Sequence, residues 1–207
     1  MAELDNHSFN DQPVLVGDNS LAKIARQLIA SAIIIVSVTG AAVWYWHQKQ
    51  QTGEAAAGAL ANAGDAAQLQ QVADQYPDSA AGASALLRLA ADCQEKQDYA
   101  GAAELYDRYL QKNAKSPLAP AAQFAQAGCL QAAGQKAAAQ AAYLAIISAK
   151  PSNPYAGGAS VALARIYWAE HNPGAARQTL TDFISRDINS GYLNEANRLL
   201  RELDANP

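Results

Sequence analysis

The sequence has little charge, little cysteine and little phenylalanine or methionine. Only 16% of its 207 residues are charged, and it has two cysteines, one methionine and three phenylalanines. Two cysteines cannot build a disulfide framework, and Cys93 and Cys129 lack the clustered spacing of a zinc site. The net charge of −4 argues against a nucleic-acid-binding protein, which needs a basic face to neutralise phosphates.

Alanine is abundant instead, at 49 residues, and glutamine is also common. Both are good helix formers, whereas sheets favour β-branched residues. This composition excludes an all-β fold and disfavours a doubly wound α/β fold. We therefore expect an all-α protein.

One long apolar run lies near the N-terminus. Residues 28–46 contain no charge, and a helix of 19 residues is about 28 Å long, enough for the hydrocarbon core of a bilayer. The run ends in Trp44, Tyr45 and Trp46, amphipathic rings of the kind found at membrane interfaces. A buried core helix rarely stays apolar on every face for five turns, so we predict a transmembrane helix over residues 21–47.

Flanking charges indicate the orientation of this helix. Lys23 and Arg26 precede the run and only Lys49 closely follows it, which favours a cytoplasmic N-terminus. Residues 1–20 then form a disordered cytoplasmic tail, and the remaining chain lies in the periplasm of a bacterium. A cleaved signal peptide is the alternative, since residues 40–42 offer a small-x-small site, but the run is long and a polar leader precedes it.

The remainder of the chain repeats with a period of 37 residues. Each unit shows two helical patterns separated by a short polar turn, which makes the two helices antiparallel neighbours. Expected caps of the first helices are Ser79, Ser116, Asn153 and Ser190. Aligned alanines in these helices are Ala90, Ala127 and Ala164. Second helices open at Asp98, Gln135 and Asn172, and their packed faces align Ala102, Ala139 and Ala176, then Tyr106, Tyr143 and Leu180.

This pattern resembles the tetratricopeptide repeat, with three residues added to the standard unit. Leu89, Ala90 and Cys93 carry the motif in the first unit, whereas Gln126 departs from it in the second. We expect an α-solenoid of about three helix pairs over residues 79–189, stacked into one continuous core. A linker helix and a half repeat without its partner helix occupy residues 48–78, and a capping helix occupies residues 190–207. Gly53, Gly58 and Gly64 should weaken any continuation of the membrane helix into this linker.

A signal anchor followed by an alanine-rich repeat domain is similar to the ancillary SecYEG translocon subunit family (YfgM-like), whose repeats resemble those of the cell division coordinator. The resemblance implies a non-enzymatic inner-membrane scaffold that binds translocon subunits, periplasmic chaperones or exported chains. A cell-envelope or division coordinator with the same repeats is the alternative function.

Catalytic and cofactor-binding motifs are missing from the sequence. There is no nucleophile elbow, zinc-protease motif, phosphate loop or dinucleotide fingerprint. His7, His47 and His171 are scattered, and Asp and Glu are spread as surface charge. We therefore expect no enzyme activity, no cofactor, no metal and no small-molecule substrate. Whether Cys93 and Cys129 pair is left open.

The partner-binding face should lie on the first helix of each unit, which lines the inner face of a tetratricopeptide array. Leu87, Phe124 and Val161 recur there at one period and form either an apolar groove or part of the core. Trp168 and Arg165 are the stronger candidates, because Trp and Arg are enriched at interface hot spots. Trp168 stands where the other units have Gln94 and Gln131, so the large ring is surplus to the fold.

Overall fold

The computed structural model describes residues 18–149 and 152–205, and all nine regular elements of these residues are α-helices. The chain divides into two compact units, residues 1–51 and residues 52–207. The predicted tail lies outside the described residues as far as position 17, and the first helix begins at Asp18. The helices are α1 (Asp18–Asn62), α2 (Ala66–Gln75), α3 (Ala80–Glu95), α4 (Tyr99–Asn113), α5 (Ala119–Ala132), α6 (Lys136–Ser148), α7 (Ala156–Ala169), α8 (Pro173–Arg186) and α9 (Leu193–Ala205).

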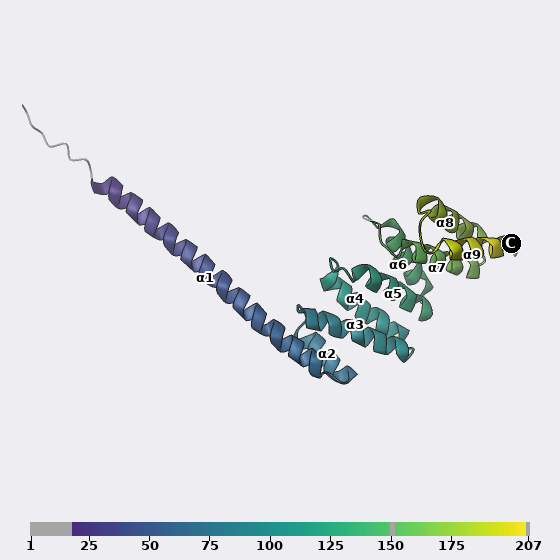
Figure 1. Ribbon diagram of the computed structural model, residues 1–207, viewed down its shortest axis with the longest axis horizontal. Coiled ribbons are helices and arrows are strands. Elements are labelled where there is room, and N and C mark those ends of the chain that lie inside the picture. The colour runs from purple at the N-terminus through teal and green to yellow at the C-terminus, as the bar shows by residue number, and fades with distance from the viewer. Residues whose placement is uncertain (1–17, 150–151, 206–207) are drawn as a thin grey trace, which may run out of the picture. The chain divides into compact units, whose positions relative to one another are not determined.

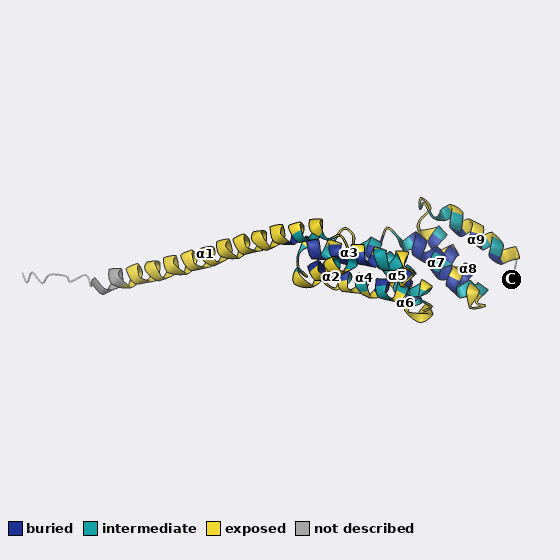
Figure 2. Ribbon diagram, turned by 90° about the horizontal axis from the view of Figure 1, so that it is seen from below, coloured by how far each residue is buried: buried dark blue, intermediate teal, exposed yellow. Residues whose placement is uncertain are grey.

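Within residues 1–51, α1 exposes every side chain described from Lys23 to Gln51 (Figure 2). Within the helix beyond Lys23, a segment of 18 residues has a mean hydropathy of 2.0, and 0% of it is buried. The hydroxyls of Ser37 and Thr39 donate to the carbonyls of Ile33 and Ile35 within the same helix, at 2.7 and 2.8 Å. This part of α1 is therefore long and apolar enough to serve as a membrane anchor or a signal sequence.

Residues 52–207 contain antiparallel helix pairs, as the sequence predicted (Figure 1). Helices α3 and α4 form the first pair, α5 and α6 the second, and α7 and α8 the third, while α9 packs against both helices of the third pair. The all-α, tetratricopeptide-like arrangement of stacked helix pairs is thus confirmed.

The backbone repeats with the predicted period of 37. In each of the three pairs, the turn between the helices contains one residue with a positive φ: 62° at Gln97, 76° at Gly134 and 59° at His171. These left-handed residues end the first helix of each pair. Only the middle pair has glycine there, which adopts this conformation without steric cost. The second helices start where predicted, with Asp98, Gln135 and Asn172 at their N-caps.

The aligned alanines and large residues are buried in every unit. The buried residues form three clusters, centred on the first pair, on the interface of α5, α6 and α7, and on the interface of α7, α8 and α9. Leu130 packs against the first and second clusters, and Tyr167, one period later, packs against the second and third. A large side chain at this repeated position therefore packs against two neighbouring clusters and joins them.

The predicted caps of the first helices are correct only for Ser79, whose Oγ accepts from Gly82 N at 3.0 Å. Helices α5 and α7 begin two residues later than expected, at Ala119 and Ala156. Ser116 and Asn153 instead accept a bond from the backbone N–H two residues on, so each closes a turn before the helix. The proline that follows each of them lies in that turn.

The linker continues α1 as a helix. Gly53 and Gly58 do not interrupt α1, which continues to Asn62. Ala56 in this last part is 0% exposed and belongs to the same cluster as Val72 of α2. The end of α1 therefore contributes to the core of the half repeat, and the energy of this packing offsets the cost of two helical glycines, about 1 kcal/mol each.

Candidate partner-binding face

The five predicted partner-binding residues lie on the first helices of the units, Leu87 on α3, Phe124 on α5, and Val161, Arg165 and Trp168 on α7. Leu87 and Phe124 are half-buried, whereas Val161 is 3% exposed and belongs to the C-terminal cluster. One repeated position thus changes from a partly accessible surface in the first two units to a core position in the third.

Phe124 is fixed by neighbouring aromatic rings. Its ring stacks on Tyr155 with a centroid distance of 5.3 Å and an interplanar angle of 16°, and it lies 6.1 Å from the ring of Tyr143. A Cβ at Gly158 would come within 3.1 Å of the Phe124 ring, so this glycine gives the ring its space. Phe124 therefore presents a rigid apolar edge rather than a mobile side chain.

Gln94 and Gln131, which align with Trp168, are tied to the second helix of their own unit. The phenol of Tyr106 donates to Gln94 Oε1 at 3.0 Å, and the phenol of Tyr143 donates to Gln131 Oε1 at 3.0 Å. In the third unit both residues differ: Leu180 replaces the tyrosine and Trp168 replaces the glutamine. Trp168 is half-buried against the cluster that contains Leu180, so its ring is not surplus to the fold.

Arg165 is the predicted residue that reaches solvent most clearly. Its side chain is 43% exposed, and its guanidinium lies 3.2 Å from the carboxylate of Glu195 on α9. An exposed ion pair of this kind contributes little to stability. The ion pair directs the guanidinium toward α9, and Trp168 lies one helical turn further along α7.

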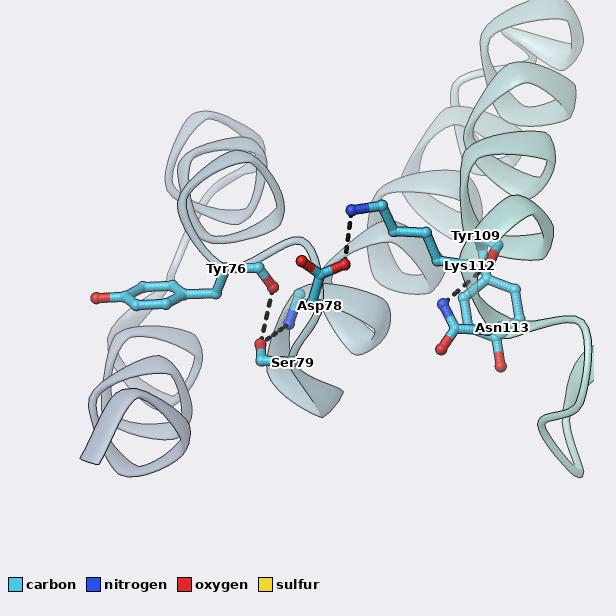
Figure 3. A network of polar contacts seen from close by, with 7 residues as sticks. Tyr76, Asp78, Ser79, Tyr109, Lys112 and Asn113 are labelled. Carbon is cyan, nitrogen blue, oxygen red and sulfur yellow. Dashed lines mark hydrogen bonds and ion pairs between the residues drawn. The ribbon is translucent and has the colours of Figure 1, made fainter. Parts of the chain in front are cut away.

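A second polar network joins the half repeat to the first unit (Figure 3). Ser79 Oγ donates to Tyr76 O at 2.9 Å while it caps α3. Lys112 of α4 forms an ion pair of 2.7 Å with Asp78 in the same loop. These contacts hold the loop against the end of α4, and they are consistent with a structural role.

A cavity of about 230 Å³, which was not predicted from the sequence, is bordered by α4, α5 and α6. The available signal was the charge pattern, since residues 117–149 contain a single charged residue, Lys136. The lining is mostly apolar, with two glutamines: Leu110, Gln123, Gln126, Ala142, Ala145, Ile146 and Ala149.

Cys93 and Cys129 are both free thiols. Burial raises the pKa of Cys129, although the bond that its Sγ accepts from Gln94 Nε2 at 3.1 Å acts in the opposite direction. Burial, together with nearby Asp98 and Asp92, raises the pKa of Cys93. Neither thiol has the lowered pKa of a catalytic nucleophile.

No group of three or more His, Cys, Asp or Glu side chains within residues 18–149 and 152–205 is arranged to hold a metal ion. His171 is an exposed turn residue, and His47 exchanges a hydrogen bond of 3.1 Å with Gln51 along α1. The predicted membrane-interface residues Trp44, Tyr45 and Trp46 are 66%, 59% and 73% exposed.

No family model and no curated protein sequence matches the chain. Among solved structures, the chain is similar to the "nearly identical TPR-like repeats" assigned to a kinesin light chain of Podosopora anserina, with 19% identity and a TM-score of 0.47. The match covers 76% of this chain and 94% of the other. A crystal structure of a single-substitution variant of the same repeats gives 18% identity and a TM-score of 0.48, over 76% and 93% of the two chains.

Proposed function

We propose that this chain is a non-enzymatic scaffold anchored in a bacterial inner membrane, with its N-terminus in the cytoplasm and its repeats in the periplasm. There it binds subunits of the SecYEG translocon and periplasmic chaperones, and it assists exported chains. The observation that supports this proposal most is an exposed, uncharged 19-residue segment of α1 joined to tetratricopeptide-like helix pairs.

The proposed binding face centres on Arg165 and Trp168 of α7, which Val161 of the same helix supports from the core. It continues over the accessible edges of Leu87 on α3 and Phe124 on α5. A guanidinium and a half-buried indole one helical turn apart offer charge, hydrogen-bond donors and apolar area on one helix. Such a combination is typical of protein-binding hot spots.

The location is tested with reporters fused after Pro207. A phosphatase that is active only in the periplasm should be active there, and a fluorescent protein that matures only in the cytoplasm should remain dark. The reverse pattern would contradict the proposed location. Loss of residues 1–42 from the mature chain would show a cleaved signal peptide instead of an anchor.

The binding face is tested by placing a photo-crosslinking amino acid at Arg165 and, as a matched control, at Arg177. Both side chains are 43% exposed and both are paired with carboxylates of α9, but Arg177 lies on the second helix of the unit. We expect crosslinks to translocon subunits or chaperones from position 165 only. Equal crosslinking from both positions would contradict the proposed face, and crosslinks to division proteins would favour the coordinator function.

A further inference from the structure

The cavity bordered by α4, α5 and α6 lies where the first helix pair contains leucine. Gln123 and Gln126 of α5 and Ala142 of α6 line the cavity. The residues one period before these three are all leucines, and the first two of them are buried: Leu86, Leu89 and Leu105. The fold therefore does not require the cavity, since the first pair has large apolar side chains at the aligned positions.

The cavity lining also lacks the charges that the first pair carries at aligned positions. Ala145 and Ala149 line the cavity. One period before them, Arg108 and Lys112 of α4 form ion pairs of 2.7 Å with carboxylates of the half repeat. Among the described residues that line the cavity, none is charged. A charged ligand would find no counter-charge here, so the cavity favours an uncharged one.

Each glutamine of the lining has one end of its amide already paired. Gln123 Oε1 accepts from Asn153 Nδ2 at 3.0 Å, and Gln126 Nε2 donates to Asp107 Oδ1 at 3.3 Å. These partners fix both amide orientations, because Asn153 Oδ1 already accepts from Tyr155 N and a carboxylate only accepts. Within the described part of the chain, Gln123 Nε2 and Gln126 Oε1 have no partner. The two glutamines therefore offer one donor and one acceptor, three residues apart on one face of α5.

We propose that the cavity binds an extended segment of another polypeptide and takes up one apolar side chain of that segment. The N–H and C=O of one extended residue pair with Gln126 Oε1 and Gln123 Nε2. The side chain of the same residue enters the apolar part of the lining, beside Leu110 and Ile146. Main-chain hydrogen bonds of this kind accept many sequences, and the cavity adds a preference for an apolar residue.

The volume and the two unpaired amide atoms together favour this ligand over others. The cavity of about 230 Å³ is larger than the roughly 150 Å³ that suffices for benzene in an apolar protein cavity, so a leucine side chain fits. A small apolar molecule would leave the donor and the acceptor unpaired, which weakens its binding. A folded second copy offers few free backbone groups, since its own are paired within helices. An extended segment supplies both the side chain and the backbone groups.

This site is separate from the proposed binding face, because its lining includes neither Arg165 nor Trp168. It also requires no membrane. Only the source of the peptide, which we assign to exported chains, rests on the proposed function. Failure of the anchor, or of the crosslinks from position 165, would therefore leave peptide binding unaffected, and the reverse also holds.

The test uses the full chain in lipid nanodiscs and a short capped peptide of glycine and serine with one central photo-leucine, a leucine analogue that crosslinks on irradiation. We expect saturable labelling of the cavity lining, located by mass spectrometry of the digested chain. An unlabelled peptide with a central leucine should compete, and one with a central alanine should compete at least about tenfold less well, because it buries less apolar surface. A peptide with a central N-methyl-leucine lacks the N–H that Gln126 accepts, and it should compete about fivefold less well.

Variants of the chain complete the test. Ala142→Leu introduces the leucine that the first pair has at this position and fills part of the cavity, so it should reduce the labelling about tenfold. Ala141→Leu, on the exposed side of the same helix and outside the lining, is the matched control and should change the labelling less than about twofold. Helical circular dichroism shows whether each variant is folded, and the peptide competition decides the question if Ala142→Leu unfolds.

Three outcomes would overturn the proposal. Labelling that does not saturate, or that maps outside α4, α5 and α6, would show that the cavity holds no peptide. Labelling that survives in folded Ala142→Leu would place the peptide elsewhere on the chain. Equal competition by the leucine and N-methyl-leucine peptides would show that the cavity takes an apolar group without binding an extended backbone.

Discussion

The third helix pair holds its two helices together by a different chemistry from the first and second pairs. In the first two, a tyrosine of the second helix donates to a glutamine of the first, Tyr106 to Gln94 and Tyr143 to Gln131. In the third, Leu180 and Trp168 occupy the two positions, and Trp168 packs against the apolar cluster that contains Leu180. A polar clamp is thus exchanged for an apolar one within one backbone arrangement.

This difference between the pairs shows why one aligned position cannot be interpreted alone. Glutamine at two of three repeats suggested a solvated surface, on which a tryptophan would be free to bind partners. The glutamines are in fact occupied internally, and the substitution to tryptophan accompanies the loss of its tyrosine partner. Pairs of positions, rather than single ones, repeat along the solenoid.

The largest effect is expected when only one of the two residues of the tyrosine–glutamine hydrogen bond is introduced into the third pair. Leu180 is 0% exposed, so Leu180→Tyr alone should destabilise the chain by about 2–4 kcal/mol, through overpacking and a buried hydroxyl without a partner. The double variant Trp168→Gln with Leu180→Tyr should recover at least half of this loss. Urea unfolding of the full chain in mild detergent, followed by helical circular dichroism, measures both. Additive losses in the double variant would show that the two positions are independent.

The next effect concerns the alanine that all three pairs share at the contact between their helices. Ala139 is 0% exposed, and Ala139→Leu should cost about 1–3 kcal/mol by overpacking. Ala137→Leu on the exposed side of the same helix is the matched control and should change stability by less than about 0.5 kcal/mol. Equal melting of both variants would contradict the 37-residue register.

The sequence alone predicted the helix pairs well, because the information is local and repeated. Small and large residues recur at one period, and a face that repeats three times leaves few alternative registers. The N-caps of α5 and α7 could not be placed this way. Ser116 and Asn153 are suitable caps by residue type, and only the backbone shows that each closes a turn before the helix.

The candidate site was less predictable than the fold, because burial depends on contacts between distant segments. Leu87, Phe124 and Val161 are equivalent by spacing, yet Val161 alone is fully covered, in the cluster completed by α9. The ion pair of Arg165 with Glu195 also joins residues 30 positions apart. No local pattern contains such a contact.

Removing one phenol from the polar clamp should have a smaller effect than disturbing the packing. Tyr143→Phe should cost about 0.5–1.5 kcal/mol, the net value of a typical hydrogen bond. The effect should also depend on pH. Burial raises the pKa of Tyr143 above its ordinary value of 10.0, so the folded chain retains a proton that the unfolded chain loses first.

The contribution of Tyr143 to the stability of the fold is fully present below pH 10.0. It is lost as the pH rises through the raised pKa. Urea unfolding at increasing alkaline pH should therefore show a steeper fall in stability for the native chain than for Tyr143→Phe. Parallel curves would show that the phenol is not buried in solution.

The smallest effect is expected at the caps of the second helices, where the middle unit differs from its neighbours. Asp98 and Asn172 accept from the backbone N–H of Gly101 and Ala175, at 3.0 and 3.1 Å, whereas Gln135 makes no such bond. Gln135→Asp should therefore stabilise the chain by about 0.5–1 kcal/mol, since it satisfies an orphan donor and adds a negative charge at a helix N-terminus. The reciprocal variant Asp98→Gln should lose a similar amount in the same urea titration. If Gln135→Asp leaves the unfolding midpoint unchanged, the longer side chain already satisfies this helix end in solution, and the units do not differ in their caps.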